Sequence, residues 1–462
     1  MVRSSYRATA EPPPVRLAEL IGALSHALDM TEGQPPGHCI RACWIGIHVG
    51  RAIGLDARAL PDLYYTLLLK DLGCSSNAAR ICALYLADDI RFKRGFKTID
   101  GSLGAALRFV FTQTGLEAGL AERIRAIVNI LQNGGEIVRD LIETRCHRGA
   151  EIAAKMRFSA RVQDGIRSLD EHWDGRGQPL GLSGDAIPGN AAIALLAQVV
   201  DVFHTERGRT AAVAEIRARD GTWFAPALVE AFLAAQAAPG FWEVLAGDAV
   251  AERVLALDPG IDAAPVDEGY LDDITAAFAD VVDAKSTFTS DHSRRVTLYA
   301  DMIAEELGLG AAHRRWLRRA GLLHDIGKLA VSNTILDKPG KPDEAEWAAL
   351  RAHPGHGAEI LGRVAAFRDI APLAGAHHER LNGRGYPLGL RDAEICLETR
   401  ILTVADVFDA LSANRPYRPA MPIADALAIL DRDTGTAFDA DCVAALKRGL
   451  ARFTEAPAAA VA

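Results

Sequence analysis

The stretch Gly321-Leu322-Leu323-His324-Asp325-Ile326-Gly327-Lys328 (GLLHDIGK) decides how this sequence is interpreted. An apolar run delivers His324 and Asp325 side by side, and both residue types ligate borderline divalent metals. As neighbours on a helix they diverge by about 100°. One ion cannot easily use both, whereas two adjacent ions can if the Asp325 carboxylate bridges them. Lys328 follows on the same helical face, where its ammonium could meet a metal-held phosphate. Taken alone, a His-Asp dipeptide is more often a hydrogen-bonded pair at a helix end. The downstream residues must therefore decide between such a pair and a metal site.

The composition bounds the class of protein. The chain has 462 residues, of which 24% are charged and 49% hydrophobic, enough for two or three globular domains. Its net charge of −9 argues against a nucleic-acid polymer or an anionic membrane as partner. The longest apolar stretch, residues 191–200, is interrupted by Gln198 and is too short to span a membrane. Seven cysteines without a CxxC pair predict a reducing, cytoplasmic setting.

Helical periodicity dominates and alternating strand patterns are nearly absent, so we expect an all-α protein. An internal repeat organises it: DEHWDGRGQPLGL (170–182) matches HERLNGRGYPLGL (378–390), and further pairs follow in the same order. The sequence therefore predicts two tandem helical bundles of one type. The expected boundaries are a disordered lead-in (1–14), a first copy (15–236), a linker that looks partly helical (237–268), a second copy (269–452) and a tail (453–462).

Histidines and aspartates recur through the second copy in helical and apolar contexts. Asp406, for example, lies in the apolar stretch TVADVFDAL (403–411), where an unpaired carboxylate would be costly and a bound metal would remove that cost. Any one of the histidines would more often be a surface or hydrogen-bonded residue, which is our interpretation of His313 and His356. The full set points to a metal site: His292, His324, Asp325, His353, His377, His378 and Asp406.

The motifs of the second copy resemble the HD-GYP subgroup of the HD phosphohydrolases. They are HSRRV (292–296), HDIGK (324–328), HPGHGAEIL (353–361), HHERLNGRGYP (377–387), VADVFDAL (404–411) and NRPYR (414–418). The resemblance implies an all-α fold, a centre of divalent ions (iron or manganese), and hydrolysis of cyclic di-GMP to linear pGpG and onward to GMP.

By the same resemblance, the seven residues named above are the metal ligands. Asp325 bridges the ions and is catalytic, together with Lys328, which also contacts a substrate phosphate. Tyr386 lies at the pocket rim, and Arg415 and Arg418 approach the substrate.

The number of ions follows from one departure from the family pattern. Members with three metals carry a Glu one turn before the first His, and here that position is Phe288. We therefore expect two ions and weaker turnover of the linear product.

The first copy reads as a degenerate version of the second. Its residues at the seven ligand positions are, in the same order, His38, Lys70, Asp71, Arg145, Leu169, Asp170 and Asp201, and Cys74 and Gln178 replace Lys328 and Tyr386. Lys70 and Arg145 place positive charge where metals would sit. We expect residues 15–236 to be catalytically silent and to brace or regulate the second copy, or to mediate a homodimer or a signalling contact.

Several functions remain open at this point. The leading one is a metal-dependent phosphodiesterase for cyclic di-GMP. A second is hydrolysis of another nucleotide, such as a hybrid cyclic GMP-AMP or a guanosine polyphosphate. His353, His377 and His378 argue against the polyphosphate, whereas base selection among cyclic dinucleotides cannot be predicted. A third is a ligand-responsive signalling scaffold, which suits the first copy better than the second.

Overall fold

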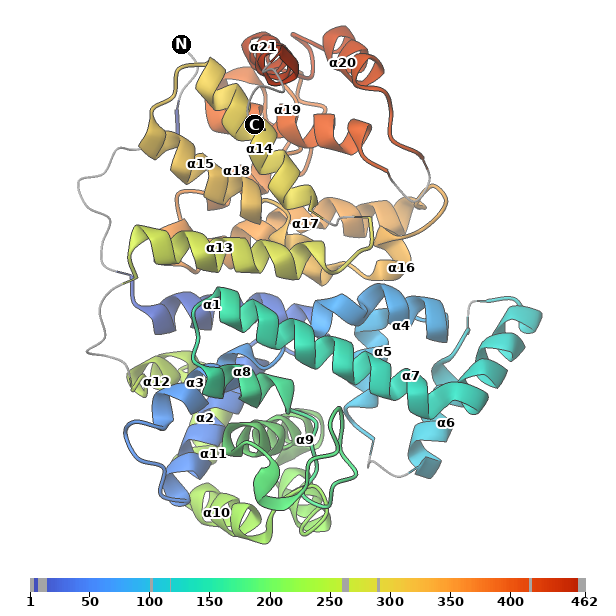
Figure 1. The fold of residues 1–462 in the computed structure, drawn as a ribbon, viewed down its shortest axis with the longest axis vertical. Helices are drawn as coiled ribbons and strands as arrows, with labels where there is room; N and C mark the ends of the chain where they lie inside the picture. Colours follow the sequence, from blue (N-terminus) through green and yellow to red (C-terminus); the bar gives the residue numbers. More distant parts are fainter. Residues whose placement is uncertain are drawn as a thin grey trace, which may run out of the picture. The chain divides into compact units, whose positions relative to one another are not determined.

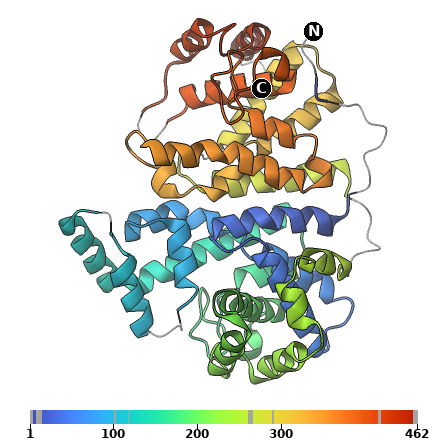
Figure 2. The same cartoon turned by 180° about the vertical axis from the view of Figure 1, so that it is seen from behind.

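The protein is all-α, as predicted. The computed structural model describes residues 4–6, 15–99, 103–116, 118–259, 266–288, 291–414 and 418–455. These residues form helices joined by loops (Figures 1 and 2), and their β-structure is limited to isolated bridges. Among the helices described, none combines the length and apolar character needed to cross a membrane.

The described residues fall into two compact units. The N-terminal unit contains residues 15–273 together with 332–334, and the C-terminal unit contains residues 4–6, 274–331 and 335–455. Each unit holds one copy of the sequence repeat.

The N-terminal unit is built around α2 (His38–Ala52), an almost fully buried helix. It packs against α1, α3, α9, α10 and α12. The other helices of this unit are α1 (Leu17–Thr31), α3 (Leu60–Leu69), η1 (Cys74–Asn77), α4 (Ala78–Tyr85), α5 (Asp89–Phe96), α6 (Leu103–Gln113), α7 (Leu120–Lys155), α8 (Ala160–Arg167), η2 (Gly184–Ala186), α9 (Gly189–Ala218), α10 (Pro226–Gln236), α11 (Phe241–Ala246) and α12 (Val250–Ala256).

In the C-terminal unit, α14 (His292–Glu306) packs against α15, α19 and α21, and α17 packs against η3 and α18. The other helices are α13 (Glu268–Asp283), which begins just before the unit, α15 (Ala311–Leu323), η3 (Ile326–Ala330), α16 (Asn333–Leu336), α17 (Glu344–Gly362), η4 (Ala365–Phe367), α18 (Ala371–Ala376), η5 (Asp392–Glu394), α19 (Leu397–Ser412), α20 (Ile423–Arg432) and α21 (Ala440–Glu455).

The sequence repeat is also a repeat of close backbone contacts. A Cβ atom on Gly327 would lie 1.9 Å from the carbonyl oxygen of His353, and one on Gly73 would lie 1.9 Å from that of Arg145. Real Cβ atoms do not approach so closely, so only glycine lets the chain at Gly327 approach α17, and the chain at Gly73 approach α7, at this distance. This contact brings the residues around Asp325 up to His353.

The Gly-rich loops are also held in the same way in both copies. The carboxylate of Glu379 accepts hydrogen bonds from the backbone N–H groups of Leu388 and Leu390. Glu171 does the same for Leu180 and Leu182. A buried carboxylate thus fixes each loop from within.

Three segments expected to lie outside the two bundles contain ordered residues, and the linker is partly helical as its sequence indicated. The expected linker, 237–268, contains α11 and α12, and Trp44 Nε1 donates to the Phe241 carbonyl at 3.1 Å. In the expected lead-in, the Tyr6 ring stacks on His313 with 4.2 Å between centroids. In the expected tail, α21 continues to Glu455.

Candidate metal centre

The predicted ligands come from five helices of the C-terminal unit. His292 begins α14, His353 lies inside α17 and Asp406 lies inside α19, whereas His377 and His378 directly follow α18. His324 and Asp325 occupy the break between α15 and η3, so they lie at a helix end rather than within a helix as the sequence suggested. The break changes the direction of the chain, and it lets Asp325 face residues from several helices.

Asp325 turns one carboxylate oxygen to each of two histidine pairs. Its Oδ2 lies 3.2 Å from His292 Nε2 and 3.3 Å from His324 Nε2. Its Oδ1 lies 3.3 Å from His353 Nε2 and 3.7 Å from His377 Nε2. A carboxylate that faces two separate sets of nitrogen donors is arranged as a bridge between two adjacent cations.

The remaining two ligands complete these sets. Asp406 Oδ1 lies 3.4 Å from His292 Nε2, and Asp406 Oδ2 lies 3.6 Å from His378 Nδ1. Two groups therefore gather donor atoms within 4.8 Å of one another: His292, His324 and Asp406 in one, and His353, His377 and His378 in the other.

Hydrogen bonds to the backbone fix the orientation of three imidazoles. Nδ1 of His324 lies 2.7 Å from the Gly321 carbonyl oxygen, and His353 and His377 make the same contact to the residue three positions earlier, at 2.5 and 2.6 Å. A carbonyl oxygen only accepts, so each Nδ1 carries the proton and each Nε2 presents a lone pair to the site.

The donor set fits a metal because its buried atoms otherwise lack partners. His292 Nε2, His324 Nε2 and Asp325 Oδ1 are buried without a hydrogen bond. Unpaired buried polar atoms are costly, and divalent cations at the two positions that Asp325 faces would satisfy all three. Imidazole nitrogen with carboxylate oxygen and no thiolate suits iron, manganese or zinc rather than calcium.

The electrostatics of the site favour a cation. Burial would raise the pKa of Asp325, but His324 and Lys328 hold it well below its usual range. Burial lowers the pKa of His377 well below its usual value, with help from His378, and burial brings the pKa of His378 to about 3. At neutral pH the Asp325 carboxyl is therefore ionised, and the imidazoles of His377 and His378 are neutral.

His292 titrates differently from these two histidines. Burial alone would lower its pKa, but the nearby carboxylates of Asp325, Asp406 and Asp409 raise it to about 10. With three carboxylates around it, the His292 ring holds a proton where a metal would otherwise hold the positive charge.

The predicted substrate residues fall into three groups. Lys328 Nζ lies 2.5 Å from Asp325 Oδ2, and the ring of Tyr386 lies 4.7 Å from that of His378, so both are at the site. The guanidinium of Arg418 instead donates to the carbonyls of Ala410 and Leu411 at the end of α19. Arg415 lies outside the described residues.

Sequence reasoning missed Asp409, one turn after Asp406 on α19. Its Oδ2 lies 2.7 Å from His292 Nδ1, and its Oδ1 accepts from Arg295 Nε at 2.6 Å. Asp409 therefore sets the tautomer and direction of the His292 ring without facing the metal positions. The available signal was the spacing of three residues within VADVFDAL, which places both aspartates on one helix face.

We predict that Asp409→Asn weakens metal retention about 10- to 100-fold, the usual effect of removing a partner of a metal-ligating histidine. Dialysis against graded chelator, followed by elemental analysis, measures this. Asp425→Asn, at an exposed position of α20, is the matched control and should retain metal like the wild type. Equal retention by the two variants would assign Asp409 to packing alone.

The first copy shows that one predicted correspondence is wrong. His38 Nδ1 and Arg41 Nε each lie 2.6 Å from the carboxylate of Asp201, which repeats the contacts of His292 and Arg295 with Asp409. Asp201 therefore corresponds to Asp409 rather than to Asp406, and the residue that corresponds to Asp406 is Gln198. The resemblance of VVDVF to VADVF is one helical turn out of register, because apolar residues recur with the helical period in both.

Cationic side chains occupy the metal positions of the first copy. Lys70 Nζ lies 2.8 Å from His38 Nε2 and forms an ion pair with Asp71, and all three side chains are buried. Arg145 likewise forms an ion pair with Asp170. In the first copy, Lys70 and Arg145 thus provide the positive charge that bound metals are expected to provide in the second copy.

One other group of donors lies in this unit. Glu32, Asp71 and Cys74 lie within reach of one ion. However, Lys97 Nζ lies 2.6 Å from Glu32 Oε2 and 3.9 Å from Asp71 Oδ1, so ammonium groups already neutralise these carboxylates.

The comparisons with known proteins match both units. The HD-domain family profile, described as "HD domain", matches residues 120–228 and 276–442. The 3'3'-cGAMP-specific phosphodiesterase 3 of Vibrio cholerae is 53% identical over 434 residues, which cover 94% of each chain. The cyclic di-GMP phosphodiesterase response regulator RpfG of Xanthomonas campestris is 39% identical over 212 residues, 45% of this chain and 56% of the relative. The crystal structure of a cyclic GMP-AMP specific phosphodiesterase of V. cholerae (V-cGAP3) superposes with a TM-score of 0.66 at 48% identity, covering 95% of this chain and 98% of that one.

Proposed function

The chain belongs to the HD-domain family, in its HD-GYP group, and from this premise we propose that its C-terminal unit is a phosphodiesterase that hydrolyses 3'3'-cyclic GMP-AMP in preference to cyclic di-GMP. The observation that carries the proposal is the Asp325 carboxylate, which faces two sets of imidazole nitrogens through separate oxygens. Such a pair of sites suits a phosphodiester, whose two reacting oxygens need stabilisation on opposite sides of phosphorus.

The chain's own residues contribute binding and orientation. Divalent ions held by the seven ligands would supply Lewis acidity and lower the pKa of a bound water. Lys328, only partly buried beside Asp325, offers an ammonium to a non-bridging phosphate oxygen. The Tyr386 ring lies 4.7 Å from the His378 ring, and the guanidinium of Arg351 lies 5.6 Å from the tyrosine ring centroid. Tyr386 therefore borders the ligands, where it can help to position the substrate.

The choice of substrate rests on the relatives. The sequence favoured cyclic di-GMP, with the hybrid cyclic GMP-AMP as an alternative. The similarity to a 3'3'-cGAMP-specific enzyme extends over 94% of the chain, whereas that to the cyclic di-GMP enzyme RpfG extends over 45%. The more extensive likeness supports the hybrid substrate.

We expect kcat/KM for 3'3'-cyclic GMP-AMP to exceed that for cyclic di-GMP by at least about tenfold, a difference of about 1.4 kcal/mol in transition-state binding. Both substrates are supplied together to metal-loaded protein, and the linear products are separated by chromatography. Chelated protein is the blank. Faster cleavage of cyclic di-GMP would reverse the assignment, and cleavage of neither would reject the activity.

We also propose that the centre holds two ions, iron or manganese, because Phe288 stands where a third-metal ligand would lie. Elemental analysis of protein purified without oxygen should give two ions per chain. Phe288→Glu should admit a third, because it restores a carboxylate, and Phe288→Gln is the neutral control. Three ions in the wild type would refute this count.

A further inference from the structure

The metal centre of the C-terminal unit is open to solvent beside His378. At most 8% of the side chain is exposed in six of the seven predicted ligands, whereas 21% of the His378 side chain is exposed. Lys328, 18% exposed, is the other side chain at the centre that solvent reaches. The Tyr386 ring lies 4.7 Å from the His378 ring, so it borders this opening. A substrate that reaches the ligands on this side passes Tyr386.

An exposed arginine lies next to Tyr386. Arg351 lies on α17, two residues before the ligand His353, and its guanidinium carbon lies 5.6 Å from the centroid of the Tyr386 ring. The same carbon lies 5.5 Å from the ring centroid of Trp347, one turn earlier on α17. A cation is attracted to the face of each ring, so the two contacts restrict a long and flexible side chain. Arg351 is thus positioned at the edge of the opening.

The protein does not neutralise the charge of Arg351. Among the described residues, no carboxylate forms an ion pair with it. The other two described cations that the sequence assigned to the substrate are engaged elsewhere. Lys328 pairs with Asp325, and Arg418 donates to backbone carbonyls at the end of α19. The charge of Arg351 is therefore available to an anionic ligand.

The first copy carries the opposite charge at the corresponding position. The glycine contacts described above match Arg145 with His353, so the residue that corresponds to Arg351 is Glu143. A carboxylate there would repel a phosphate, whereas a guanidinium attracts it. The charge at this position thus differs between the copy that keeps the metal ligands and the copy that has lost them.

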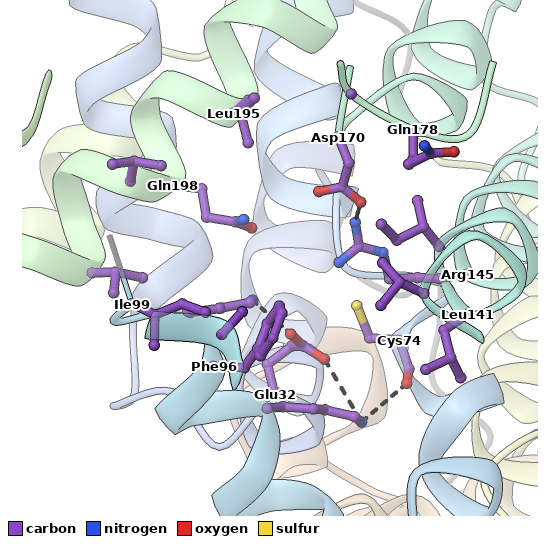
Figure 3. Close-up of a pocket in the computed structure, with 18 of the residues that line it drawn as sticks. Glu32, Cys74, Phe96, Ile99, Leu141, Arg145, Asp170, Gln178, Leu195 and Gln198 are labelled. Atoms are coloured by element: carbon purple, nitrogen blue, oxygen red, sulfur yellow. Dashed lines mark hydrogen bonds and ion pairs between the residues drawn. The ribbon is translucent and has the colours of Figure 1, made fainter. Parts of the chain in front are cut away.

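The first copy also lacks the tyrosine. Gln178 replaces Tyr386, and Figure 3 shows it on a cavity in which Arg145 lies against Asp170. These two side chains form an ion pair, so the Arg145 guanidinium is already neutralised. An arginine without a carboxylate partner, held against a tyrosine at the opening, belongs to the second copy.

We propose that Arg351 binds the second phosphate of the cyclic dinucleotide, the one that does not react at the metals. The inference rests on the proposed function, because it needs a substrate with two phosphodiester groups. A two-metal centre acts on one phosphodiester at a time, so the other phosphate needs a cation from the protein. A guanidinium suits this role because its planar N–H groups bind a phosphate through two parallel hydrogen bonds. Trp347 is a positioning residue, since it acts through Arg351.

Steady-state hydrolysis of 3'3'-cyclic GMP-AMP by the metal-loaded, full-length protein tests this role. Arg351→Gln should raise KM at least about tenfold, the usual effect of losing a charge-assisted contact, with kcat within about threefold of the wild type. Metal content should not change. Arg351→Glu, which introduces the charge of the first copy, should raise KM further, and Arg351→Lys should recover part of the affinity. Arg368→Gln, at an exposed position between η4 and α18, is the control and should keep the wild-type KM.

Two measurements show whether the contact is with the second phosphate. GpA carries both bases but only one phosphodiester, so as a competitive inhibitor it should act equally on the wild type and on Arg351→Gln. Added salt should raise the KM for 3'3'-cyclic GMP-AMP more steeply in the wild type than in Arg351→Gln, because screening weakens only a charge contact that is present.

Four results would overturn the inference: an unchanged KM in Arg351→Gln; loss of metal in that variant, which would make Arg351 a support of His353; inhibition by GpA weakened as much as the substrate; or an equal rise of KM in Arg380→Gln, which removes an exposed arginine of the neighbouring loop. A wild type that cleaves no cyclic dinucleotide would instead reject the proposed function. Calorimetry with the same nucleotide would then still compare its affinity for the wild type and for Arg351→Gln.

Discussion

Asp325→Ala is expected to abolish hydrolysis of cyclic dinucleotides and to release the metal from the C-terminal unit. Each Asp325 oxygen faces a different pair of histidines, so one substitution removes an anionic ligand from both metal positions at once. The histidines left behind are neutral donors crowded together, and Asp406 alone cannot balance two divalent ions. Activity should fall by several orders of magnitude, beyond the 10- to 100-fold expected for a residue that only supports a ligand.

The measurement is product formation together with metal content, on protein shown to be folded by circular dichroism. Asp425→Ala removes an exposed carboxylate from the same unit and should leave both quantities unchanged. Activity in Asp325→Ala within tenfold of the wild type, or metal content equal to the wild type, would mean that the carboxylate does not bridge.

The parts of this protein that could be predicted from sequence are those that local patterns encode. Helical periodicity gave the all-α class, and the paired DGRG and NGRG loops gave the tandem repeat. The bridging role proposed for Asp325, which stays a prediction, followed from two adjacent ligand types that a single ion could not share. Each of these inferences depends on short stretches of sequence, taken singly or, for the repeat, compared with one another.

What could not be predicted depends on contacts between distant residues. Asp409 supports His292 across more than a hundred residues, and its spacing from Asp406 indicates a shared helix face without identifying His292 as its partner. The register of Asp201 was misjudged because an apolar helix resembles itself when shifted by one turn; only the contacts with His38 and Arg41 decide it. Part of the expected linker was predicted to be helical, but the hydrogen bonds by which Trp44 and Tyr64 hold α11 and α12 again join distant residues.

The two copies show two ways of stabilising the same arrangement of buried His and Asp. In the second copy, Asp325 keeps an unpaired oxygen among imidazoles. In the first, the equivalent Asp71 is neutralised by Lys70, whose ammonium also contacts His38 Nε2. The Lys70 ammonium therefore lies between the His and the Asp, where the second copy is expected to hold a metal. The stability of the N-terminal unit should depend on that one positive charge.

Lys70→Ala should accordingly lower the free energy of unfolding of the N-terminal unit by about 3–5 kcal/mol, because it leaves the buried Asp71 carboxylate without its ion-pair partner. Lys97, whose Nζ is 3.9 Å from Asp71, can offset only part of this. Adding Asp71→Asn to Lys70→Ala removes the unpaired charge and should recover much of the loss. Hydrogen exchange of the α2 amides reports on this unit alone, whatever happens in the other. If Lys70→Ala exchanges like the wild type, or if the double variant is the less stable of the two, the ammonium does not take the role that metals have in the second copy.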